Sequence, residues 1–191
     1  MDTRLLLVSH APTAAMRAGR FPADDPLADR GRADIRAAQT RLSIPDDATA
    51  FVSPAICARE TALALGLTAT VAAGLADLDY GQWHGRRLAD LATEAPQDLA
   101  IWTRDPEAAP HGGESFSQLV KRVGQWLDAQ SGAPGETRNM VGVTHAPVIR
   151  AAIVHALGAS SAIFPRIEIA PLSIVELRHS RRGWTWWPSS Q

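Results

Sequence analysis

Two histidines in this chain each follow a short apolar run and each precede the dipeptide Ala-Pro. His10 lies in residues 4–13, RLLLVSHAPT, and His145 lies in residues 139–147, NMVGVTHAP. An imidazole that is neutral near pH 7 can attack an electrophile or transfer a proton. A single histidine of this kind can equally be a satisfied or merely exposed side chain. The matched pair favours a chemical role.

The apolar runs before the two histidines must position them. Leu5, Leu6, Leu7 and Val8 suit a strand buried on both faces of a parallel sheet, and they are too few to span a membrane. The residue after such a strand lies at its carboxyl end, where open α/β sheets bind ligands. Pro147 then suits the first turn of a helix. We therefore expect both imidazoles at one edge of a sheet.

Three more stretches fit with the two histidines. They are residues 53–62 (SPAICARETA), 77–85 (DLDYGQWHG) and 111–115 (HGGES). In order and rough spacing, the five stretches together resemble the histidine phosphatase superfamily, which includes the phosphoglycerate mutases and the α-ribazole phosphatases. The resemblance covers about residues 4 to 150 and implies a phosphoglycerate mutase-like fold.

The resemblance also implies a mechanism. His10 would attack phosphorus and form a phosphohistidine, and His145 would hydrogen-bond the phosphoryl oxygens. Asp77 stands where the family usually has Glu, so it would protonate the leaving oxygen and then deprotonate the attacking water. Asp77 can alternatively be no more than a turn-forming residue in an Asp-rich loop.

Two departures from the family pattern concern positive charge. The first motif is Arg-His-Gly in the family, and Ser9 stands in the arginine position here. Cys57 replaces the arginine of the second motif, Ser-x-x-x-Arg-Ala. An arginine aimed at a transferring phosphoryl group is worth roughly 10³ to 10⁵ in rate, and neither serine nor cysteine can supply its charge. The sequence therefore predicts a weakened phosphate site.

Other side chains can compensate for the missing arginines. Arg17 and Arg20 follow His10 in a loop where the family places substrate contacts, although a solvated surface arginine is the alternative. Arg59 is less suitable, because two residues of helix turn its side chain away from the face of position 57. The candidate substrate-binding residues are Ser9, Thr13, Arg17, Arg20, Cys57 and His111.

Cys57 itself has three interpretations. It can be a small buried apolar residue on the inner face of its helix, or a catalytic thiol. It can also converge with His10 and His145 as a metal ligand, if the fold closes the site. The first interpretation is the one we adopt, and we predict no metal ion and no other cofactor.

Composition limits the possible partners and compartment. The chain has 191 residues with 19 basic and 20 acidic side chains, a net charge of −1 and no run of like charge, so neither a nucleic acid nor a membrane surface is expected. One cysteine and the absence of a leader-like segment favour the cytoplasm. A small, phosphorylated molecule is the expected substrate. The oligomeric state is not indicated.

We predict a single α/β domain over residues 1–191, a three-layer α/β/α sandwich with a mostly parallel sheet. Besides the two histidine strands, a capping box predicts a helix at residues 115–130, and the strand-end proline predicts another at 147–157. Ser53 and Pro54 predict the start of a helix that runs to about residue 65 and offers free N–H groups to anions. The remaining predictions are a loop at 14–26, a helix at 27–42, and strands at 49–52, 68–73, 166–170, 172–177 and 184–187.

The leading hypothesis is a small-molecule phosphomonoester hydrolase that works through a phosphohistidine at His10. The alternative is a divergent member of the family whose pocket binds a less charged ligand, or performs acid–base chemistry on one. The histidine pair and Asp77 favour the first hypothesis, and the lost arginines favour the second.

Overall fold

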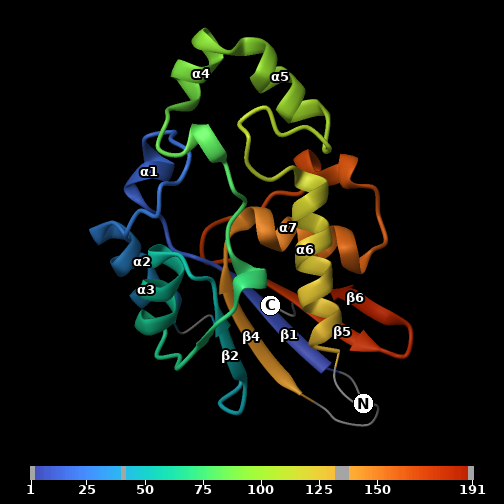
Figure 1. Cartoon of the computed structure of the whole chain (residues 1–191). Coiled ribbons are helices and arrows are strands. Elements are labelled where there is room, and N and C mark those ends of the chain that lie inside the picture. Colours follow the sequence, from blue (N-terminus) through green and yellow to red (C-terminus); the bar gives the residue numbers. More distant parts are fainter. Residues whose placement is uncertain (1–2, 40–41, 132–137, 189–191) are drawn as a thin grey trace.

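The computed structural model describes residues 3–39, 42–131 and 138–188 (Figure 1). Its strands form one six-stranded sheet in the order β3-β2-β4-β1-β5-β6. The first four strands in this order are parallel, whereas β5 and β6 are added antiparallel at one side. The strands are β1 (Thr3–Ser9), β2 (Thr49–Val52), β3 (Thr70–Val71), β4 (Asn139–Thr144), β5 (Ile174–Ser180) and β6 (Gly183–Trp187). The predicted mostly parallel sheet is confirmed.

Helices cover both faces of the sheet. The α-helices are α1 (Ala14–Arg17), α2 (Asp29–Ala38), α3 (Ile56–Ala64), α4 (Leu88–Glu94), α5 (Pro96–Arg104), α6 (Phe116–Ala129) and α7 (Ala146–Ala156). Short 3₁₀ turns are η1 (Ala73–Leu75), η2 (Gly81–Trp83) and η3 (Ser161–Arg166). None of the helices in the described ranges is long and apolar enough to cross a membrane.

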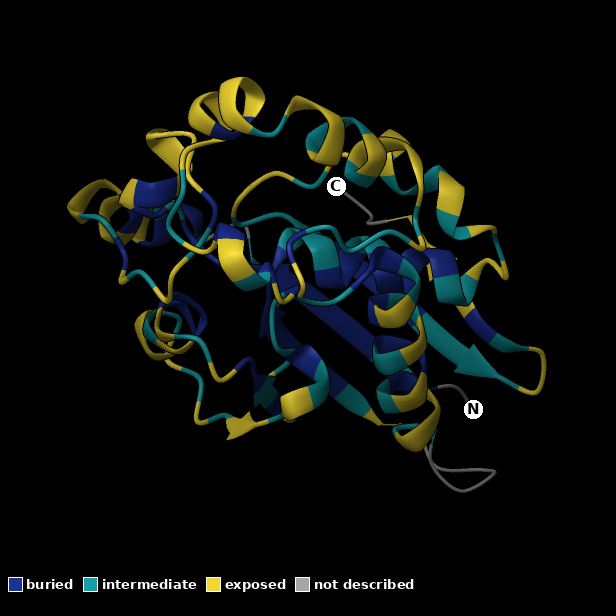
Figure 2. Cartoon of the chain, turned by 45° about the horizontal axis from the view of Figure 1, so that its top comes forward, coloured by how far each residue is buried: buried dark blue, intermediate teal, exposed yellow. Residues whose placement is uncertain are grey.

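The alternation of side chains along β1 explains the three layers. Leu5 and Leu7 point into the core cluster that contains the apolar faces of α6 and α7. Leu6 and Val8 point the other way, into a cluster with Ala58 of α3. All four β1 residues are at most 2% exposed, and Figure 2 shows the central strands buried between the helices. A continuous apolar run is what a strand with two covered faces requires.

The register of β1 and β4 brings the two histidines together. Ser9 pairs with Thr144 in the parallel ladder, so the next residue of each strand lies at the same edge. The His10 backbone N–H continues the ladder by donating to the Thr144 carbonyl at 2.9 Å. The expectation of adjacent strand-end imidazoles is confirmed.

Several predicted boundaries are wrong. Within the range 27–42, predicted as one helix, the structure has the shorter helix α2, and residues 40–41 lie outside the described ranges. A short helix, α1, interrupts the predicted loop at 14–26. The strand predicted at 68–73 is reduced to β3, and 166–170 forms no strand. Leu172 has a left-handed φ of 59°, which ends any extended run there, so β5 begins only at Ile174.

The start of α3 also differs from the prediction. The helix begins at Ile56 with Ala55 as its N-cap, two residues later than Ser53 and Pro54 suggested. Ser53 is fully buried, and its hydroxyl shares a hydrogen bond with His145. The helix predicted at 115–130 is confirmed as α6, including the reciprocal capping box of Ser115 and Gln118.

An aromatic cluster packs under the helices α4 and α5, which lie above the site. The helices α4 and α5 lie at the top of Figure 1, beyond the carboxyl ends of the parallel strands. Phe21, Tyr80, Trp83, Trp102 and His111 pack ring against ring, with centroid separations of 5.0 to 6.5 Å. The cluster joins α5 to the segment that follows η1 and therefore fixes that segment over the sheet edge.

Candidate active site

His10 lies directly after β1 with one ring nitrogen engaged. Its Nδ1 is 2.8 Å from the carbonyl oxygen of Ala11, and because a carbonyl only accepts, Nδ1 must carry the proton. Burial, and then the neighbouring His145, lower the pKa of His10 to about 4, so the imidazole is neutral at pH 7. A neutral ring protonated at Nδ1 has its lone pair on Nε2. This is the tautomer that a nucleophile requires.

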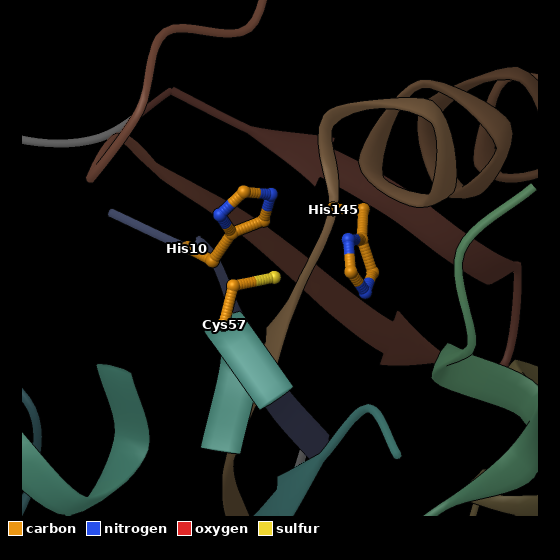
Figure 3. Close-up of side chains that lie close together, drawn as sticks. All are labelled: His10, Cys57 and His145. Atoms are coloured by element: carbon orange, nitrogen blue, oxygen red, sulfur yellow. The ribbon is translucent and has the colours of Figure 1, made fainter. Parts of the chain in front are cut away.

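His145 lies directly after β4 and at the N-terminus of α7. Its Nε2 shares a 2.8 Å hydrogen bond with the Ser53 hydroxyl, while its buried Nδ1 has no hydrogen-bond partner among the described residues. Burial, and then the charge of Arg122, lower the pKa of His145 to about 3. Its ring centroid is 5.0 Å from that of His10, and the two rings meet edge-on at an interplanar angle of 63° (Figure 3).

Asp77 reaches the two histidines from the segment between η1 and η2. Its Oδ2 lies 3.3 Å from Nδ1 of His145, and its Oδ1 accepts a hydrogen bond from the Leu78 N–H. Burial raises the pKa of Asp77 to about 6, against opposing contributions from the Leu78 hydrogen bond and His10. A carboxyl with such a pKa can carry a proton close to neutral pH, as a general acid must.

Arg122 on α6 fixes the segment that carries Asp77. Its guanidinium donates to the backbone carbonyls of Ala73, Gly74, Ala76 and Asp77, and it forms a two-nitrogen pair with Glu114. No sequence pattern indicates this role, because the partners are carbonyls more than 40 positions away in the chain. Arg122 is thus a positioning residue rather than a phosphate ligand.

The two positions expected to hold arginines supply no positive charge. Ser9, the last residue of β1, is 3% exposed, and Cys57 on the inner face of α3 is 6% exposed. Burial, and then Asp77, raise the pKa of Cys57 to about 12, which keeps the thiol protonated. One ligand-type atom from each of His10, Cys57 and His145 lies within 4.8 Å of the other two. The burial expected for Cys57 is confirmed.

The pocket in front of these residues has an acidic mouth. Its volume is about 260 Å³, and its lining residues are Pro22, Asp24, Ala55, Asp77, Leu78, Asp79, His84 and His145. Asp24 accepts a 2.8 Å hydrogen bond from the Ile56 N–H, the first of α3, so a carboxylate already occupies the helix N-terminus that was predicted to be free for anions. That prediction is wrong for this N–H group.

His84 is the cation of the mouth. Its Nδ1 donates to the Pro22 carbonyl at 2.7 Å, and its Nε2 lies 3.0 Å from an Asp79 oxygen. Burial lowers the pKa of His84, but the Pro22 and Asp79 hydrogen bonds outweigh it and raise the pKa overall. Its charge is therefore paired with Asp79, whose pKa the Gly81 N–H and His84 lower. Sequence reasoning missed Asp24, Asp79 and His84 as site residues.

The remaining candidate residues lie outside this constellation. Thr13 caps α1 by accepting from the Met16 N–H, and Arg17 and Arg20 are exposed. His111 is 0% exposed, with its ring 5.0 Å from that of Trp83 and its Nδ1 accepting from Gly113 N–H. Among the described residues, no arginine contributes to the pKa shifts of His10 or Cys57. The structure thus joins the histidines, Asp77, Ser9 and Cys57, but not the four other candidates.

Comparison with known proteins identifies relatives of the whole fold. The model of the histidine phosphatase superfamily (branch 1) matches residues 5–187. A bifunctional protein of Mycobacterium tuberculosis is 32% identical over 184 residues, which cover 91% of this chain and 50% of that protein. The chain therefore spans about half the length of this relative.

Two further relatives have names that state an activity. An adenosylcobalamin/α-ribazole phosphatase of Salmonella typhi is 29% identical over 183 residues, covering 91% of this chain and 90% of that protein. The structure of a mycobacterial glucosyl-3-phosphoglycerate phosphatase complexed with VO3 has a TM-score of 0.84, with 26% identity and 96% of each chain covered.

Proposed function

The chain belongs to the histidine phosphatase superfamily, and on that premise we propose that it hydrolyses a small-molecule phosphomonoester through a phosphohistidine at His10. The proposal is supported by relatives named as phosphatases and by the convergence of His10, His145 and Asp77 at the sheet edge. The observation that carries it is the Ala11 carbonyl, which holds the His10 proton on Nδ1 and leaves the Nε2 lone pair free.

The proposed reaction has two steps. In the first, Nε2 of His10 attacks phosphorus, the bond to the leaving oxygen breaks, and protonated Asp77 gives that oxygen its proton. In the second, Asp77 takes a proton from water as the water attacks phosphorus. The P–N bond then breaks, phosphate leaves and His10 is regenerated. His145 contacts the phosphoryl oxygens in both steps.

The charge of the pocket predicts a weak grip on phosphate. Negative charge spreads over three oxygens during transfer, and this site meets it with neutral Ser9 and Cys57 and with the carboxylates of Asp24 and Asp79 at the mouth. We expect phosphate and vanadate to bind at about millimolar affinity, near −4 kcal/mol. Turnover should be correspondingly slow.

A second candidate function follows from the position of Asp24. Its carboxylate takes the Ile56 N–H at the start of α3, so a group of the protein occupies a place where an anion could otherwise bind. This observation favours a less charged ligand, which the pocket would bind or process by acid–base chemistry at His10 and His145. Such a protein would show ligand binding without phosphate release.

The test is a panel of phosphomonoesters assayed with the wild type, His10→Ala and the control His155→Ala. His155 lies on α7 and pairs with Asp128 rather than with the site. We expect His10→Ala to reduce turnover below a few per cent of the wild-type rate, and His155→Ala to retain it. Intact mass at alkaline pH should show a phosphorylated wild type and an unmodified His10→Ala. Substantial turnover by folded His10→Ala would exclude the mechanism.

A further inference from the structure

We propose that His10, Cys57 and His145 form a binding site for a transition-metal ion of the Zn²⁺ class, a property that goes beyond the proposed phosphatase activity. The three side chains come from the end of β1, the first turn of α3 and the end of β4. Two imidazoles and one thiolate form a donor set that zinc prefers, and three protein ligands leave a fourth position open.

The separations between the three ligand atoms are close to those around a bound zinc ion. One ligand-type atom from each side chain lies within 4.8 Å of the others, and Figure 3 shows the sulfur and the two rings directed toward a common space. Tetrahedral zinc with these donors places its ligand atoms about 3.3 to 3.7 Å apart, so the widest pair needs to approach by about 1 Å. We expect small side-chain rotations to close this gap.

Hydrogen bonds fix the neighbouring backbone around this space. The Thr61 hydroxyl accepts from the Ala11 N–H at 3.1 Å and donates to the Cys57 carbonyl at 2.7 Å. This bridge ties the residue after His10 to the turn of α3 that carries the sulfur. The ligand positions are therefore set by the fold rather than by mobile loops.

Each histidine has one ring nitrogen held and the other free. Nδ1 of His10 donates to the Ala11 carbonyl, the kind of contact that orients metal-ligating histidines, and leaves Nε2 with its lone pair. Nε2 of His145 is held by Ser53, whereas its Nδ1 is buried without a hydrogen-bond partner among the described residues. His145 is only 2% exposed, and the nearest charged group to that nitrogen is Asp77, whose Oδ2 lies 3.3 Å away without forming a hydrogen bond, so the Nδ1 lone pair can turn to a metal ion.

The charges around the cluster favour a cation. Besides burial, the charges of Asp77 and Asp24 raise the pKa of Cys57. Asp24 also acts to raise the pKa of His145, against the effect of burial. Arg122 acts in the opposite sense on His145, but its guanidinium is paired with Glu114. An M²⁺ ion would displace the Cys57 proton to solvent and form a metal–sulfur bond, which leaves the cluster with a net single positive charge. The acidic surroundings that oppose a phosphate dianion stabilise this charge.

Metal binding and phosphohistidine formation compete for the same atom. Both use Nε2 of His10, so the metal-loaded protein cannot attack phosphorus through that nitrogen. If the proposed function is correct, stoichiometric Zn²⁺ should inhibit hydrolysis and a chelator should restore it. The two ideas can therefore fail separately, because metal binding is measured without substrate and hydrolysis is measured in chelator-treated protein.

The test is a Co²⁺ titration of the reduced, chelator-treated 191-residue chain without an affinity tag, followed by displacement with Zn²⁺. We expect one equivalent of Co²⁺, visible d–d bands of a tetrahedral ion and a near-ultraviolet thiolate-to-metal band. The chain has a single cysteine, so that band can arise only from Cys57. Cys57→Ser should abolish the band and weaken Zn²⁺ binding at least about tenfold, whereas His155→Ala should change neither.

A second variant and a second method distinguish loss of the metal site from misfolding of a variant. His145→Gln should also weaken Zn²⁺ binding at least about tenfold, and circular dichroism checks that each variant is folded. X-ray absorption at the zinc edge should show one sulfur and two imidazole nitrogens. A stoichiometric complex without sulfur, no binding at all, or unchanged affinity in both folded variants would overturn the proposal.

Discussion

The buried cluster of His10, Cys57 and His145, called the inner wall here, contrasts with the pocket mouth, Asp24, Asp79 and His84. Of the inner wall, His145 lines the pocket, and His10 and Cys57 lie behind it. The inner wall is buried and uncharged at neutral pH, and it offers free lone pairs. The mouth is charged and acidic, with its imidazolium paired to Asp79. The inner wall therefore retains groups that can react with phosphorus, while the mouth lacks the positive charge that would hold a phosphate.

The difference shows that the residues that react with phosphorus and the residues that bind the phosphate anion are separable features of this fold. Sheet register positions the inner-wall histidines, and any sequence that keeps the pairing of β1 with β4 keeps positions 10 and 145 side by side. Loops and helix starts position the mouth, so its charge can change without loss of the core. Arg122 also shows that a positive charge near the reacting groups need not bind phosphate. Its guanidinium lies near Asp77, but backbone carbonyls and Glu114 take its hydrogen bonds.

The largest effect should come from Asp77, which lies between the two regions. With the proposed mechanism, kcat/KM rises with pH through about 4 as His10 loses its proton, and falls through about 6 as Asp77 loses its own. Asp77→Asn should lower the rate about 10² to 10⁴-fold and remove the upper limb of the profile. Pre-steady-state and steady-state rates across this range measure both. Activity that continues to rise above pH 7 would contradict the assignment of Asp77 as the acid.

A smaller effect, an increase in activity, should follow from placing arginines beside His10 and in the inner wall, at the two positions where the family has them. Ser9→Arg with Cys57→Arg should raise phosphatase activity at least about tenfold, because each guanidinium can grip two phosphoryl oxygens. The matched control, Ser9→Gln with Cys57→Gln, adds length without charge. Thermal melts of both are needed, because a buried arginine that finds no partner costs several kcal/mol. A folded arginine variant no faster than the control would show that charge is not what limits this site.

The inner wall could be predicted from sequence because it depends on local pattern. Four apolar residues before His10 favour a strand with two covered faces, the run before His145 favours a second one, and the family resemblance implies that the two strand ends and Cys57 lie close together. The capping box at the start of α6 is equally local. Such features are encoded within a few residues of the position that they determine.

The position of Asp24 at the mouth, and two details elsewhere, could not be predicted because they depend on contacts between distant segments. Asp24 accepts a hydrogen bond from Ile56 of α3, 32 positions away in the chain. Its left-handed φ of 58° is not predictable from the residues around it. Ser53 matches a cap by residue type, yet the buried Nε2 of His145 takes its hydroxyl. Leu172 adopts a left-handed conformation that no propensity favours. In each case a tertiary contact overrides the local preference.

Replacing Arg122 tests whether this residue stabilises the protein by holding the backbone of the segment that carries Asp77. Arg122→Met should lower the free energy of unfolding by about 2 to 4 kcal/mol, because the partly buried Glu114 loses its partner. The melting temperature should fall by about 5 to 10 °C. The control Arg32→Met, which breaks the more exposed Arg32–Glu60 pair, should cost less than about 1 kcal/mol. Equal shifts in the two variants would mean that Arg122 has no special positioning role.

The smallest effect should come from Asp24→Asn, which changes the charge of the mouth while its side-chain oxygen can still accept from the Ile56 N–H. Vanadate should bind about two- to fivefold more tightly and Co²⁺ about two- to fivefold more weakly at low salt, and both changes should shrink as salt screens the charge. The control Asp25→Asn alters a carboxylate that accepts from Ala23 and does not line the pocket. Because one substitution should move an anion and a cation in opposite directions, a general loosening of the pocket cannot imitate the result. Parallel shifts, or none, would show that the mouth does not control the charge preference of the inner wall.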